Sequence, residues 1–126
     1  MTEVEKLVTD FFAYIANEES TIEKAKTFMT ITQQESCKVV SGNPVDGNIM
    51  GMHQLIKRCE ILSIKEKIST NKVMKDCIIK LKSKENEKVI KYSCRCVKEI
   101  GLRKTSEEGT WGINVNSFRY LKKGEK

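Results

Sequence analysis

The apolar residues near the C-terminus alternate with polar ones, and the alternation changes phase once. The odd-numbered set is Trp111, Ile113 and Val115, and the even-numbered set is Phe118 and Tyr120. Alternate residues of a strand share one face of a sheet, so a single inserted residue would place both sets on the same face. The pattern predicts a strand over residues 109–121 with a β-bulge near Asn116 or Ser117. Such a bulge bends the sheet.

Three earlier segments show the same period of two and predict further strands. They cover residues 61–68, 73–82 and 90–96, and polar turns at residues 70–72 and 84–88 separate them. Their alternating apolar residues are Leu62, Ile64, Ile68, Val73, Cys77, Ile79, Leu81, Ile90, Tyr92, Cys94 and Cys96. Short turns between alternating segments are typical of antiparallel pairs. We therefore expect an antiparallel meander of four long strands.

The first half of the chain has helical periodicity instead. Thr2 with Glu5, and Ser20 with Glu23, form capping-box patterns, and Asn48 can cap a third helix. The apolar faces that follow are Val4, Leu7, Val8, Phe11, Phe12 and Ile15; then Ile22, Ala25, Phe28 and Met29; then Ile49, Met52, Leu55, Ile56 and Cys59. Residues 35–40 resemble a short strand, and residues 41–47 a turn rich in Gly, Pro and Asn. The fold class is α+β, with three N-terminal helices packed on a strongly curved, mostly antiparallel sheet.

Charge divides the chain more clearly than its total suggests. The 126 residues suit a single domain spanning 1–126, and the formal net charge is +6. Residues 1–52 hold 4 Lys and Arg against 8 Asp and Glu, a net charge of −4, whereas residues 53–126 hold 19 against 9, a net charge of +10. The predicted sheet therefore carries the positive charge, which suits an acidic partner, an anionic ligand or a nucleic acid.

The residue types that hold metals or act as nucleophiles are sparse. The five cysteines, at positions 37, 59, 77, 94 and 96, lack metal-site spacing, and His53 is the only histidine. Cys77, Cys94 and Cys96 occupy apolar strand positions, where cysteine acts as a small hydrophobe. We expect no metal, no cofactor and no catalytic thiol. An acidic, amphipathic N-terminus and the lack of an apolar run of ~18 residues argue against a membrane span, so we expect a cytoplasmic protein.

The order of these elements resembles the nuclear transport factor 2-like superfamily, which includes the SnoaL-like and ketosteroid isomerase-like proteins. The resemblance rests on the helical hairpin, the Gly/Pro-rich turn, the third helix and a Trp-containing last strand that ends Ser117-Phe118-Arg119-Tyr120. It covers nearly the whole chain and implies a cone in which the curved sheet closes around the helices. It also implies a pocket at the wide end and a homodimer.

The resemblance also suggests where a ligand would bind. The expected pocket residues are Phe11, Tyr14, Tyr92, Cys94, Trp111 and Phe118. At positions where the family's isomerases carry a catalytic tyrosine and carboxylates, this chain has Phe11, Ser41 or Asn43, and Tyr92. We therefore predict a non-catalytic domain that binds a small apolar ligand or a protein partner.

Two other functions fit the same residues. A small isomerase, dehydratase or hydrolase could use Tyr14 with Tyr92 or His53. Alternatively, the outward face of the sheet could bind an acidic partner or nucleic acid through Lys65, Lys67, Lys80, Lys82, Lys91 and Arg95. Nucleic acid is disfavoured because the aromatic residues, which would stack on bases, fall on the opposite face.

Overall fold

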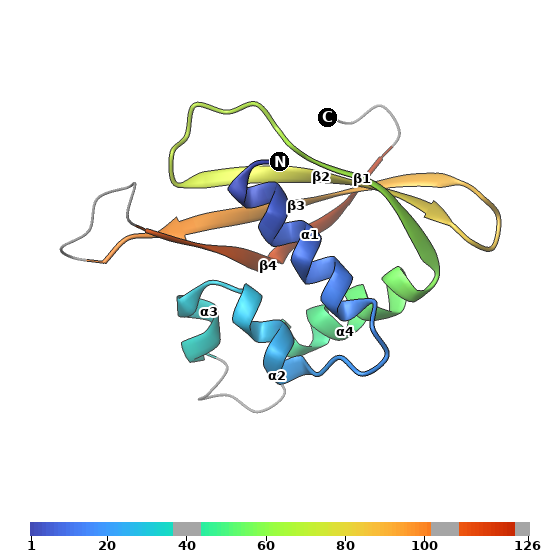
Figure 1. The fold of residues 1–126 in the computed structure, drawn as a ribbon, viewed down its shortest axis with the longest axis horizontal. Coiled ribbons are helices and arrows are strands. Elements are labelled where there is room, and N and C mark those ends of the chain that lie inside the picture. Colours follow the sequence, from blue (N-terminus) through green and yellow to red (C-terminus); the bar gives the residue numbers. More distant parts are fainter. Residues whose placement is uncertain (37–43, 102–108, 123–126) are drawn as a thin grey trace.

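The computed structural model describes residues 1–36, 44–101 and 109–122. Helices α1 (Glu3–Ile15), α2 (Ile22–Ala25), the 3-10 helix η1 (Lys26–Phe28), α3 (Ile31–Ser36) and α4 (Pro44–Lys57) precede the strands β1 (Cys59–Glu66), β2 (Met74–Ser83), β3 (Val89–Glu99) and β4 (Thr110–Leu121). The strands form one curved antiparallel sheet in the order β1-β2-β3-β4. Helix α1 lies across the sheet, and α2, α3 and α4 gather beside it (Figure 1). The predicted α+β class and meander are confirmed.

The core lies between the helices and one face of the sheet. Helix α1 contributes Val4, Val8, Phe11, Phe12 and Ile15, and the strands contribute Cys77, Ile79, Leu81, Cys94, Cys96, Ile113 and Val115, all at most 2% exposed. These are the helical stripe and the alternate strand residues that the sequence pattern selects. In the described residues, no helix has the length and apolar character to cross a membrane.

Strand β4 carries the predicted bulge, and the bulge is larger than expected. Asn114 pairs with Arg95 and Arg119 pairs with Ser93, so residues 115–118 of β4 lie opposite Cys94 alone. Three extra residues are inserted rather than one. Because three is also an odd number, the residues that face the core still change from odd-numbered to even-numbered positions across the bulge. Phe118 therefore packs against the core, whereas Tyr120 remains 52% exposed.

Several predicted boundaries are wrong. Helix α4 begins at Pro44, four residues before Asn48, because proline fits the first turn of a helix, where its missing N–H costs nothing. The N-cap of α2 is Thr21, whose side chain accepts a hydrogen bond from the Lys24 N–H, so Ser20 is not the cap. Residues 35 and 36 end α3 instead of starting a strand, and residues 37–40 lie outside the described part of the chain.

The first strand also differs from its prediction. It begins at Cys59, which the sequence pattern assigned to the third helix, and a bulge lies between Ile61 and Ser63. Ile61 and Ile64 consequently pack against the core, while Leu62 is 43% exposed. Ile68 lies beyond the end of the strand and is fully exposed. An irregularity in pairing, which alternation alone cannot reveal, reverses the facing at this point.

The segment that joins η1 to the first turn of α3 covers part of the edge of β4. Met29 forms a parallel bridge with Ile113, and the Thr30 N–H donates to the Ile113 carbonyl at 3.2 Å. Gln33 adds two side-chain hydrogen bonds, one from its Nε2 to Asn114 Oδ1 at 2.9 Å and one to its Oε1 from the Val115 N–H at 3.2 Å. Residues 29–33 thus form hydrogen bonds with β4 groups that an open edge strand would present to other chains.

Candidate functional site

The six residues expected to line a ligand pocket are packed among their neighbours. Phe11 and Cys94 are at most 1% exposed, and Tyr14, Tyr92, Trp111 and Phe118 are half-buried against the same core. The rings of Tyr92 and Phe118 stack with centroids 4.8 Å apart, and Phe118 also contacts Phe12 at 5.7 Å. Four pockets on the described residues, of about 70 to 260 Å³, are lined by other residues. An interior ligand pocket at the six residues stays a prediction.

Other rings join Phe11 and Tyr14 to this stack, since Phe11 packs against Phe12 with ring centroids 5.2 Å apart. The Phe28 ring bridges Phe11 and Tyr14, with centroids 5.7 Å from Phe11 and 6.0 Å from Tyr14. Trp111 lies under the ammonium group of Lys98, which is 5.8 Å from its ring centroid. The structure therefore links Tyr92, Phe118, Phe11 and Tyr14 through ring contacts, with Phe12 and Phe28 between them. No such ring contact joins Trp111 to them among the described residues.

The tyrosines and histidine considered for catalysis have structural contacts. The Tyr14 hydroxyl accepts a hydrogen bond from the Thr21 N–H at 2.8 Å, and its contacts with Thr21 lower the pKa of Tyr14. Burial raises the pKa of Tyr92. His53 Nδ1 lies 2.6 Å from the carbonyl oxygen of Ile15, and His53 lines a pocket of about 70 Å³ that neither tyrosine lines.

The cysteines on the strands are buried free thiols. Burial is the main cause of the raised pKa of Cys59 and Cys77, and a hydrogen bond with Cys96 is the main cause at Cys94. Cys37 lies outside the described residues. Within the described ranges, His, Cys, Asp and Glu side chains form no group of three or more that could hold a metal ion.

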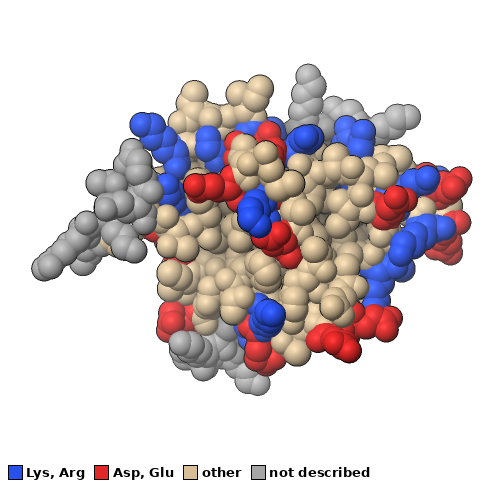
Figure 2. Space-filling view, viewed as in Figure 1, with Lys and Arg blue, Asp and Glu red and all other residues tan. Residues whose placement is uncertain are grey.

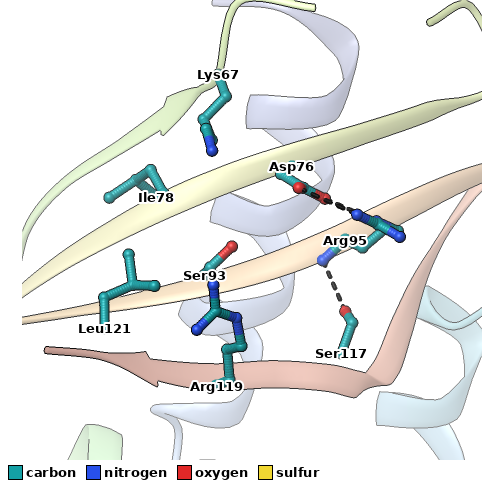
Figure 3. A pocket seen from close by; sticks show the side chains of 8 residues that line it. All are labelled: Lys67, Asp76, Ile78, Ser93, Arg95, Ser117, Arg119 and Leu121. Atoms are coloured by element: carbon teal, nitrogen blue, oxygen red, sulfur yellow. Dashed lines mark hydrogen bonds and ion pairs between the residues drawn. The ribbon is translucent and has the colours of Figure 1, made fainter. Parts of the chain in front are cut away.

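A pocket of about 260 Å³ opens on the face of the sheet that points away from α1 (Figure 3). We call it the sheet-face pocket, and its lining residues are Lys67, Asp76, Ile78, Ser93, Arg95, Ser117, Arg119 and Leu121. Seven of them come from β2, β3 and β4, and Lys67 is the residue that follows β1. Lys67 and Arg119 extend toward the pocket from opposite sides in Figure 3.

The pairing of β2 with β3 brings two oppositely charged side chains of this pocket together. Asp76 and Arg95 are direct partners on β2 and β3, and the guanidinium of Arg95 contacts the carboxylate through Nε–Oδ1 at 2.9 Å and Nη2–Oδ2 at 3.4 Å. This pairing raises the pKa of Arg95. The bulge brings Ser117 beside β3, where its hydroxyl accepts a hydrogen bond from the Arg95 N–H at 2.7 Å. Both the side chain and the backbone of Arg95 are therefore fixed.

A second pocket of about 230 Å³ adjoins the first. Its lining is Lys67, Ile68, Ser69, Asn71, Met74, Asp76 and Arg95, so the two pockets share three charged residues. Ile68 is fully exposed and Met74 is 39% exposed. Together the pockets form a groove with a basic end and an apolar end. On the face drawn in Figure 2, by contrast, acidic and basic side chains are interspersed.

Sequence reasoning identified part of this site. Lys67 and Arg95 belong to the predicted basic face, but Arg119, Ser117 and the concavity were missed. A signal for Arg119 was present, because a bulge that turns Phe118 and Tyr120 inward necessarily turns the residue between them outward. Comparisons with protein-family models, with curated proteins and with solved structures find no match for this chain.

Proposed function

We propose that this protein is a non-catalytic binding domain of the nuclear transport factor 2-like kind, which binds an acidic segment of a partner protein in the sheet-face pocket. The observation that carries the proposal is the lining of that pocket, where the described residues include the basic side chains of Lys67, Arg95 and Arg119 and one carboxylate, that of Asp76. Positive charges gathered in a concavity attract anionic groups more strongly than the same charges spread over a flat surface.

Two further features support a protein segment as the ligand. The adjoining pocket extends the groove to Ile68 and Met74, whose exposed apolar side chains suit a peptide that carries apolar residues next to acidic ones. The interior at the six predicted pocket residues is closely packed, which favours binding on the outside of the sheet. The order of the helices and the strongly bulged β4 support the proposed cone-like family.

The expected homodimer would compete with this function if it formed through the same face. Like charges that face each other across a sheet interface repel, and Lys65, Lys80 and Lys91 surround the pocket on their strands. We therefore propose that any homodimer leaves the sheet-face pocket open.

The test is binding of a fluorescein-labelled peptide of eight glutamates, measured by anisotropy. Arg119→Gln and Lys67→Gln are each expected to weaken binding about fivefold, since an exposed charge pair contributes up to about 1 kcal/mol. Lys88→Gln, in the exposed β2–β3 turn, makes the same charge change away from the pocket and should bind as the wild type does. Raising the salt concentration should weaken binding by the wild type.

Three results would overturn the proposal. The first is no peptide binding at low salt, and the second is equal affinity in all three variants. The third is tighter binding of a single-stranded oligothymidylate than of the peptide, which would favour nucleic acid as the partner. Thermal unfolding of each variant checks that the fold is retained.

A further inference from the structure

The charge inside the sheet-face pocket suits an anion that carries more than one negative charge. Among the residues that the structure describes, its lining contains three basic side chains, those of Lys67, Arg95 and Arg119, and one acidic side chain, that of Asp76. Basic groups thus outnumber acidic ones in the described lining. A carboxylate carries one negative charge, whereas a phosphate monoester carries about −1.5 to −2 near pH 7 and offers three acceptor oxygens.

Arg95 is already oriented for an oxyanion. Two of its guanidinium nitrogens contact Asp76, and Ser117 holds its backbone N–H. A guanidinium has five N–H donors, so those that do not point at Asp76 remain available. An ordered Arg fork loses less conformational freedom on binding than a flexible lysine does, and its planar geometry matches phosphate oxygens two at a time.

The remaining lining suits a phosphorylated side chain better than a bare ion. Ser93, the pairing partner of Arg119, adds a hydroxyl, and Ile78 and Leu121 add apolar atoms beside the cations. Leu121 is 4% exposed, so its side chain is packed into this face and not extended into solvent. Apolar atoms next to the cations can contact the carbon atoms that carry a phosphate.

We propose that the group bound in the sheet-face pocket is the phosphate monoester of a phosphorylated side chain, held by Arg95, Arg119 and Lys67. This inference rests on the proposed function and narrows it from an acidic segment to a phosphorylated one. The partner's chain would continue along the groove toward Ile68 and Met74, which places an apolar residue close to the phosphorylated one.

The experiment compares three labelled peptides of one sequence that differ at a central position, which is phosphoserine, glutamate or serine. The phosphoserine peptide is expected to bind at least tenfold more tightly than the glutamate peptide, and the serine peptide more weakly than either. Inorganic phosphate should compete with the phosphoserine peptide. The affinity of the phosphoserine peptide should also fall as the pH drops from 7.5 to 5.5. The second pKa of a phosphate monoester is about 6, so the phosphate loses negative charge over this range.

Variants separate the geometry of the pocket from its charge. Arg95→Lys keeps the charge and removes the planar guanidinium. It should weaken binding of the phosphoserine peptide about tenfold and change the affinity for the glutamate peptide less than twofold. Arg119→Gln should weaken binding of both peptides. Lys88→Gln, the charge-matched control, should change neither.

The outcomes distinguish this inference from the proposed function. Equal affinity for the phosphoserine and glutamate peptides, with both weakened by Arg119→Gln, would overturn the phosphate inference and leave the acidic partner standing. Binding of the phosphoserine peptide that neither Arg95→Lys nor Arg119→Gln alters would overturn the assignment to this pocket. Failure of every peptide to bind would overturn both proposals.

Discussion

The carboxylate of Glu99, the last residue of β3, accepts two hydrogen bonds from Thr32 in the first turn of α3. The Thr32 N–H lies 3.0 Å from Oε2, and the Thr32 hydroxyl lies 2.7 Å from the same oxygen. The N–H of Ile31 donates to the other carboxylate oxygen. One charged side chain thus joins the start of a helix to the sheet, and it satisfies N–H groups that have no partner within the helix.

This contact predicts a pH-dependent stability. Burial alone would raise the pKa of Glu99, but the hydrogen bonds from Thr32 and Ile31 outweigh it and leave the pKa below its ordinary value. A lowered pKa stabilises the folded state at pH values above the unfolded pKa, about 4.3, and this stability is lost as the pH falls through the folded pKa. Glu99→Gln should lower the free energy of unfolding by about 1 kcal/mol at pH 7.

Chemical denaturation between pH 7 and pH 3 measures this effect. The difference between wild type and Glu99→Gln should shrink as the pH falls through the lowered pKa of Glu99, because protonation removes the negative charge that accepts these hydrogen bonds. Glu85→Gln, in the exposed β2–β3 turn, is the control and should unfold as the wild type does. A difference that does not change with pH would contradict the role assigned to the Glu99 charge.

The surroundings of Gly112 and Gly51 predict opposite effects of alanine substitution on the stability of the protein. A Cβ at Gly112 would lie 2.6 Å from both the Cα and the N of Thr30, and these backbone atoms belong to the segment that pairs with β4. Gly112→Ala should therefore destabilise the protein by about 1–3 kcal/mol. Gly51, within α4, has no atom within 4 Å of its Cβ position, so Gly51→Ala should stabilise by about 0.5–1 kcal/mol. Thermal unfolding of both variants tests the signs, and two shifts in the same direction would refute the contact.

Ser117 replaces a backbone group in the ladder at the bulge. Its hydroxyl accepts a hydrogen bond from the Arg95 N–H at 2.7 Å and donates one to the Asn114 carbonyl at 2.6 Å. Ser117→Ala leaves both groups without this partner and should reduce the free energy of unfolding by about 1–2 kcal/mol. Ser63→Ala on β1 is the matched control. Equal denaturation midpoints for the two variants would show that the hydroxyl does not support the bulge.

The buried thiols should resist alkylation in the folded protein. Thiolates are the reactive species, and the raised pKa values of Cys77 and Cys94 disfavour them. Iodoacetamide at pH 8 should leave Cys77, Cys94 and Cys96 unmodified in the native state and label all three in denaturant, as read by peptide mass spectrometry. Rapid native labelling of Cys94 would contradict its 1% exposure.

The candidate site could be predicted only in part. Alternation on β2 and β3 placed Arg95 outward with the lysines, because regular strands keep a strict period of two. The pairing of Asp76 with Arg95 depends on register, which a one-residue slip would change. The concavity depends on how many residues are inserted at the bulge in β4. The sequence pattern reveals that this number is odd but does not reveal its value.

The spacing of apolar residues was sufficient to predict the α+β class, the core faces of α1, α2, α4, β2 and β3, and the position of the bulge in β4. These properties follow from the spacing of apolar residues, since burial of a continuous apolar face dominates the free energy of folding. Tertiary contacts settled the three-residue size of the bulge in β4, the reversed facing within β1 and the packing of Phe11 against the Phe28 ring. Those outcomes depend on contacts between residues far apart in the chain, and local periodicity carries no information about such contacts.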